Sequence, residues 1–115
     1  MTSPAIDHAT FEELKTTTGA EFVCELVDTF LAEAPAMLSD LRSAFDDGDA
    51  ERFRRAAHSL KSNGNTFGAT AFADLARKLE LGGLAPVRDA AGAPMDLLRR
   101  EYARVAEALN ALKNG

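Results

Sequence analysis

The feature that most restricts the fold is a long run of apolar residues at helical spacing in the first half of the chain. Between residues 19 and 47 they recur every three or four positions, at Phe22, Val23, Leu26, Val27, Phe30, Leu31, Ala34, Met37, Leu38, Leu41 and Phe45. This spacing places them along one side of an α-helix. No segment alternates apolar and polar residues with the β-branched enrichment that is typical of strands. The sequence therefore predicts an all-α protein.

Start and stop signals divide the chain into predicted helices over residues 10–16, 19–47, 50–66, 69–81 and 94–112. We interpret Thr10 and Thr18 as capping-box residues that open the first two helices, each with a glutamate three positions later. Gly48 is expected to end the second helix and Asp49 to cap the third. Proline removes a backbone donor and crowds the preceding turn, so a kink is predicted near Pro35.

The segment from residue 84 to residue 93 contains Pro86 and Gly92 and is predicted to be a loop before the last helix. Long amphipathic helices joined by short turns pack as an antiparallel, up-down four-helix bundle. The first predicted helix is too short to be a full member and is expected to cover one end. A chain of 115 residues suits one domain, so residues 1–115 are interpreted as a single unit.

Composition excludes several classes of function. The formal net charge is −5, which argues against a nucleic-acid binder, and no apolar run is long enough to span a bilayer. Cys24 is the only cysteine, so neither an intrachain disulfide nor a two-cysteine metal site is expected. The first residues do not resemble a signal peptide. These observations favour a soluble, cytoplasmic domain. We also expect the protein to be a monomer.

His58 is the main candidate for function. The predicted third helix has an apolar stripe made of Phe53, Ala56, Ala57, Leu60, Gly64 and Phe67. On a helical wheel His58 lies roughly 150° from the centre of this stripe, so its imidazole is expected to face water. Its neighbours on the wheel carry positive charge or short hydrogen-bond donors: Arg54, Arg55, Lys61, Ser62 and Asn65.

Such an arrangement suits a carrier of phosphoryl groups. A histidine side chain is nucleophilic near neutral pH, and phosphoryl transfer depends mainly on positioning and on neutralisation of charge. Lys61, one turn along, is expected to pair with phosphoryl oxygens, and Ser62 and Asn65 to donate to them. An exposed histidine is most often only a solvated residue, however, and His8 is interpreted in that way.

The segment from Ala57 to Ala69 strengthens the functional interpretation. Its His58, Leu60, Lys61, Ser62 and Gly68 have the identities and spacing of a known signature. The segment resembles the signature of histidine-containing phosphotransfer (HPt) domains, which act in multistep two-component relays. The similarity extends along almost the whole chain, although only this central segment is diagnostic.

The resemblance implies a role for each matching residue. His58 would be the phosphorylated residue, and Lys61 would stabilise the phosphoryl group. Ser62 would be the small residue beside the imidazole, where many members have glycine. Gly68 would end the helix and allow the fourth helix to pack closely.

The resemblance also implies the partners, which would be response-regulator receiver domains and a hybrid histidine kinase. The receiver carries the acceptor aspartate and binds Mg²⁺, so no cofactor or metal is expected on this chain. The sequence has no nucleotide-binding motif, so we expect a phosphoryl carrier without ATP-dependent kinase activity. The positions of Met1 and of the last helix favour a free-standing carrier, although a domain excised from a larger kinase stays open.

Two other functions stay open at this point. The chain could be a module that binds and regulates a receiver or kinase without accepting phosphate, or a helical oligomerisation domain in which His58 is incidental. A docking protein also needs apolar surface near the site, and the sequence does not separate surface from core among the candidates Ile6, Phe11, Leu14, Phe22 and Val23.

Overall fold

The structure is a computed structural model that describes residues 5–114. Over these residues the chain forms six helices and no strand: α1 (His8–Thr18), α2 (Ala20–Asp47), α3 (Ala50–Thr66), α4 (Thr70–Gly82), α5 (Leu84–Asp89) and α6 (Ala93–Asn114). The prediction of an all-α fold is confirmed.

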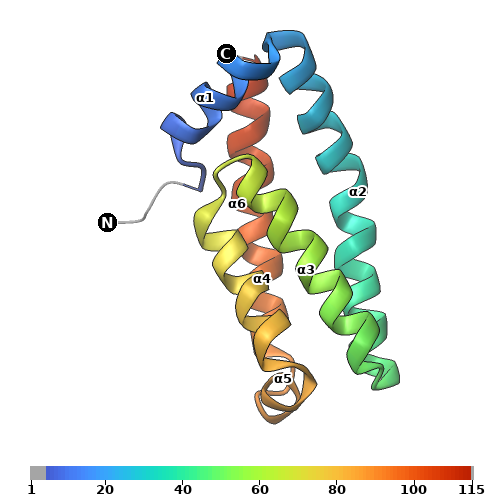
Figure 1. Cartoon of the computed structure of the whole chain (residues 1–115). Helices are drawn as coiled ribbons and strands as arrows, with labels where there is room; N and C mark the ends of the chain where they lie inside the picture. Colours follow the sequence, from blue (N-terminus) through green and yellow to red (C-terminus); the bar gives the residue numbers. More distant parts are fainter. Residues whose placement is uncertain (1–4, 115) are drawn as a thin grey trace.

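Four long helices make up the body of the molecule. Successive members α2, α3, α4 and α6 run in alternating directions, and α1 and α5 lie at opposite ends of the bundle (Figure 1). Helix α3 packs against α2 and α4, and α6 packs against the same two helices. The short α1 rests on α2, so it covers one end as predicted.

The connection between α2 and α3 follows the sequence signals. Gly48 adopts a left-handed conformation with a φ of 70° and ends α2. Asp49 then caps α3, because its Oδ1 accepts a 3.1 Å hydrogen bond from the backbone N–H of Arg52. Both predicted caps are confirmed.

The predicted capping boxes at Thr10 and Thr18 are wrong. Helix α1 begins at His8 after the N-cap Asp7, and the hydroxyl of Thr10 donates to Asp7 Oδ2 at 2.6 Å. Thr18 is the last residue of α1, and its hydroxyl donates to the carbonyl of Leu14 at 2.8 Å. A threonine that bonds to its own preceding turn is accommodated inside a helix, so neither residue opens one.

The segment predicted to be a loop contains the short helix α5. Pro86 lies in its first turn, where the missing N–H of a proline has no intrahelical partner to lose. Val87 in the next position is buried. Leu84 is partly buried against the core as well. Two apolar residues three positions apart are too few to reveal a helical period in the sequence.

Helix α2 continues through Pro35 without a break. Proline cannot donate to the carbonyl four residues earlier, which is that of Leu31. The hydroxyl of Tyr102 on α6 approaches this carbonyl at 3.5 Å. Partial burial raises the pKa of the Tyr102 hydroxyl, which therefore stays protonated and able to donate. The long bond links α6 to the proline turn of α2.

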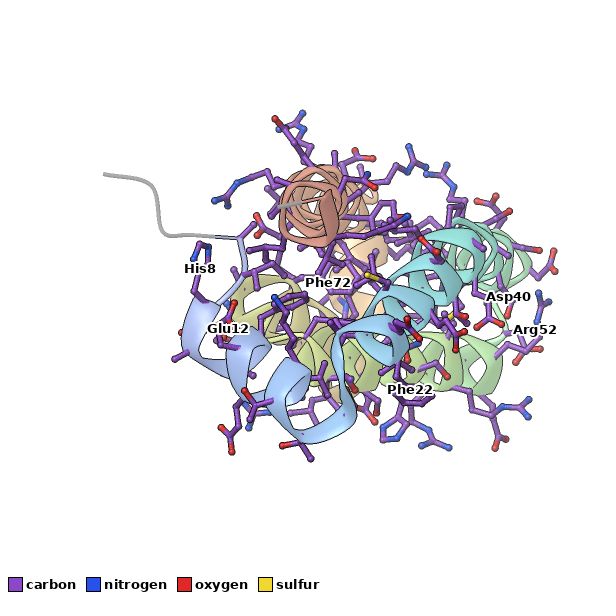
Figure 2. All side chains as sticks on the ribbon, turned by 90° about the horizontal axis from the view of Figure 1, so that it is seen from above. His8, Glu12, Phe22, Asp40, Arg52 and Phe72 are labelled. Carbon is purple, nitrogen blue, oxygen red and sulfur yellow. The ribbon has the colours of Figure 1, made fainter. Side chains whose placement is uncertain are left out.

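Aromatic rings fill the centre of the bundle. Phe30 contacts Phe67, Phe72 and Tyr102, with ring centroids 5.4, 6.2 and 5.9 Å apart. Viewed from above, Phe72 points inward from α4 toward the middle of the helices (Figure 2). Because these rings come from α2, α4, α6 and the C-cap residue of α3, the core joins all four long helices.

The predicted stripe of α3 is confirmed, since each of its six residues is buried. Within the stripe, Gly64 lies directly against Phe72 and Ala73 of α4. A Cβ atom at this position would lie 2.8 Å from Cδ2 of Phe72. Glycine is therefore required here by the neighbouring helix.

Gly68 lies between the end of α3 and the start of α1. Its φ of 77° is compatible with the end of α3, as expected for a glycine after a helix. The nearest atoms belong to the first turn of α1 and its N-cap: a Cβ would lie 2.8 Å from Thr10 Cβ and 3.0 Å from the Asp7 carbonyl oxygen. The N–H of Asp7 also donates to the Gly68 carbonyl at 2.8 Å.

We expect Gly64→Ala to destabilise the protein, because the added methyl group would overlap the ring of Phe72. Overpacking of this kind costs about 1–3 kcal/mol, more than the ~1 kcal/mol that alanine gains over glycine in a helix. Urea unfolding measures the difference. The control is Gly82→Ala, where the new Cβ would lie 3.6 Å from Pro86 Cγ. Equal stability of the two variants would contradict the assignment.

Candidate functional site

His58 projects from the outer side of α3. Its side chain is 55% exposed, while the residues on either side of it in the stripe, Ala57 and Leu60, are fully buried. The imidazole is thus held on a helix whose opposite face is fixed in the core. The predicted orientation of His58 is what the structure shows.

A carboxylate on the neighbouring helix contacts both His58 and Lys61. Oε2 of Glu80, in the last turns of α4, lies 2.7 Å from Nδ1 of His58. Its other oxygen, Oε1, lies 2.8 Å from the Nζ atom of Lys61. The contact with Lys61 is a close ion pair without the angles of a directional hydrogen bond. The three side chains form a cluster, which we call the His58–Lys61–Glu80 cluster.

Glu80 is ionised near neutral pH. Its contact with Lys61 is the main reason why the pKa of the carboxyl lies below the ordinary value of 4.5; the bond to His58 adds to this effect, while partial burial opposes it. An ionised carboxylate only accepts hydrogen bonds, so His58 donates to it from Nδ1. In a neutral imidazole the lone pair then lies on Nε2, the other ring nitrogen.

The remaining predicted site residues lie on the same helix. Ser62 and Asn65 are exposed, one and two turns after His58. Arg54 is also exposed and lies 3.7 Å from Glu51. Arg55 lines a shallow hollow of about 300 Å³ between α2 and α3, together with Ser59 and Met37.

A further arginine of α3, Arg52, is paired with two carboxylates of α2. Arg52 binds Asp40 at 2.7 Å and Asp47 at 3.2 Å, and Figure 2 shows Arg52 and Asp40 together at the outer edge of the bundle. These carboxylates raise the pKa of Arg52, with the hydrogen bond to Asp40 as the largest cause. Arg52 therefore links α3 to α2. Lys61 is connected to the imidazole of His58 through the carboxylate of Glu80, which contacts both.

Comparison with known proteins decides the family. The family model described as the Hpt domain matches residues 25–115, which is most of the chain. The chain belongs to the Hpt domain family. Among solved structures, histidine-containing phosphotransfer protein B (HptB) from Pseudomonas aeruginosa PAO1 is similar, with a TM-score of 0.88 and 26% sequence identity over 98% of this chain and 97% of that one. No curated protein matches the sequence.

Glu80 was not recognised as a site residue of this Hpt domain from the sequence. A signal was present, because Ala73, Ala76 and Glu80 are spaced by three and four residues and share one face of the helix. Ala73 and Ala76 are buried, and Glu80 continues their face toward α3. Because Glu80 follows two buried alanines on the face that packs against α3, its carboxylate is expected to need a cationic partner on that helix.

The structure separates surface from core among the candidate docking residues. Ile6, Phe11 and Val23 are buried in the core, and Leu14 is partly buried. Phe22 is 49% exposed and lies on the side of the bundle away from α6 (Figure 2). Of the five candidates, Phe22 is the one available to a partner.

Within residues 5–114, no three histidine, cysteine, aspartate or glutamate side chains are grouped as they would be around a metal ion. None of the helices in the described range has the length and apolar character needed to cross a membrane.

We expect the Glu80 carboxyl to titrate below pH 4.5 when followed by ¹³C NMR. Because the folded pKa is lowered, the ionised cluster stabilises the fold at pH values above 4.5, and this contribution is lost as the pH falls through the lowered pKa. Lys61→Met should move the midpoint upward, since Lys61 is the main cause of the shift. An unchanged midpoint in that variant would refute the cause.

Proposed function

We propose that this Hpt domain carries a phosphoryl group on Nε2 of His58 and relays it between aspartates of receiver domains. The observation that carries the proposal is the bond between His58 Nδ1 and ionised Glu80 at 2.7 Å, which leaves the lone pair on the outward ring nitrogen. The ring is also exposed enough for a second active site to close over it. Membership of the Hpt family supports the same function.

Transfer from a receiver's aspartyl phosphate to His58 forms one bond and breaks another. The Nε2 lone pair attacks the phosphorus of a receiver's aspartyl phosphate, and a P–N bond forms. The P–O bond breaks, and its electron pair returns to the aspartate as a carboxylate. The Nδ1 proton stays in the bond to Glu80, which offsets the positive charge that develops on the ring. The reverse sequence passes the group to the next receiver.

The partner contributes what this chain does not need to carry. A receiver domain brings the acceptor aspartate and its Mg²⁺, so the proposed donors and acceptors are receivers, including that of a hybrid histidine kinase. ATP is not the donor in this proposal, and the protein acts as a carrier rather than a kinase. We place it in the cytoplasm, as a monomer.

The direct test is labelling from a receiver domain charged with ³²P. The wild-type chain should acquire phosphate that is stable to base and labile to acid, and His58→Gln should stay at background. His8→Gln is a matched control, because it removes the other histidine and should label normally. If no receiver labels the wild type while the receivers still bind it, the non-transferring regulatory module is the correct function.

We expect Phe22→Ser to slow transfer by roughly threefold to tenfold, since an exposed aromatic ring contributes on the order of 1 kcal/mol to docking. The effect should appear as a higher receiver concentration at half-maximal rate. Leu97→Ser is the control, because Leu97 on α6 is 50% exposed, which closely matches the 49% of Phe22. Equal rates for both variants would show that Phe22 is not part of the docking surface.

A further inference from the structure

The His58–Lys61–Glu80 cluster presents a conflict for the proposed function. The cation expected to neutralise the phosphoryl group lies 2.8 Å from a carboxylate in this structure. The ammonium of Lys61 cannot be in close contact with Glu80 and with a phosphoryl group on His58 without weakening one of the two ion pairs. Glu80 and an incoming phosphoryl group would therefore compete for Lys61.

From the two contacts of Glu80 we infer that it is a positioning residue that holds Lys61 as an exchangeable counter-ion: Lys61 leaves Glu80 for the phosphoryl group when His58 is phosphorylated and returns when the group departs. This inference rests on the proposed function. It assigns to Glu80 an effect on the equilibrium constant for transfer of the phosphoryl group to His58.

The carboxylate is the fixed member of the pair. Glu80 is 12% exposed, and its Oε2 is tied to His58 Nδ1 at 2.7 Å. It also lies near the C-terminal end of α4, where the helix dipole disfavours a negative charge that has no cationic partner. The ionised carboxylate of Glu80 therefore depends on its contacts with His58 and Lys61, and we expect it to stay bonded to the imidazole of His58.

The ammonium is the mobile member. Lys61 is 24% exposed, twice the exposure of Glu80, and its charge lies at the end of a flexible four-carbon stem. The ammonium is held by a single ion pair, 2.8 Å from Oε1, whereas the other carboxylate oxygen of Glu80 is held separately by His58. Lys61 is three residues after His58 on α3, which places both side chains on neighbouring points of the helix surface.

The charges favour an exchange. A phosphoryl group on nitrogen carries up to two negative charges, whereas Glu80 carries one, so Lys61 is attracted more strongly to the phosphoryl oxygens. Each exchange nevertheless breaks the contact with Glu80. This cost lowers the stability of phospho-His58, and it keeps the transfer reversible.

A double-mutant cycle isolates the competition. The equilibrium constant for transfer from a phospho-receiver is obtained from forward and reverse rates in wild type, Glu80→Gln, Lys61→Met and the double variant. Glu80→Gln also alters the bond to the ring, but that effect is the same with and without Lys61 and cancels in the cycle.

We expect Glu80→Gln to favour phospho-His58 roughly threefold to tenfold more when Lys61 is present than in the Lys61→Met background, the range for a partly exposed ion pair. Asp74→Asn, which removes an exposed charge from the same helix, should leave the equilibrium unchanged. Thermal unfolding of each variant confirms that it is folded.

The outcomes are distinguishable. If the wild type is labelled on His58 but the ratio in the cycle is one or smaller, Lys61 does not exchange and this inference is overturned while the proposed function stands. If the wild type is not labelled at all, the proposed function itself is refuted, and the exchange of Lys61 has no basis.

A spectroscopic readout is independent of rates. The ¹⁵Nζ resonance of Lys61 should shift on phosphorylation of the wild type. In Glu80→Gln the unphosphorylated resonance should already differ from that of the wild type. A Lys61 resonance that does not respond to phosphorylation would also overturn the inference.

Discussion

The close packing of α4 against α3 at Gly64 is the constraint on which the site depends. The absence of a side chain at Gly64 lets the ring of Phe72 enter between the helices, and this contact sets how far α4 is shifted along α3. Glu80 lies eight residues after Phe72, about two turns further along α4. At that point it meets His58 and Lys61, so a contact in the core determines which charged groups meet at the surface.

The sequence was most informative where many residues repeat one pattern. The stripe of α3 contains six apolar or small residues, and their periodicity alone is enough to predict that His58 faces solvent. The all-α class could be predicted for the same reason. Single-residue signals were less reliable, because the hydroxyls of Thr10 and Thr18 have alternative partners nearby that no local pattern reveals.

Contacts between distant parts of the chain could not be predicted. Glu80 is 22 positions from His58, and its role depends on the register of two helices rather than on any spacing within one. Gly68 was interpreted through its own helix and the next, whereas its neighbours are Asp7 and Thr10. The compensation of Arg52 by Asp40 and Asp47 likewise follows from the packing of α3 beside α2.

Helix α1 lies outside the segment that matches the Hpt family, yet it is joined to the rest of the fold. Ile6 and Phe11 are buried, and the backbone of Asp7 bonds to Gly68 at the corner between α3 and α4. A fragment trimmed to residues 25–115 would therefore expose apolar side chains at this corner and remove the Asp7 N–H that donates to the Gly68 carbonyl. The N-terminal helix is thus part of the packed unit, although it precedes the segment that matches the family model.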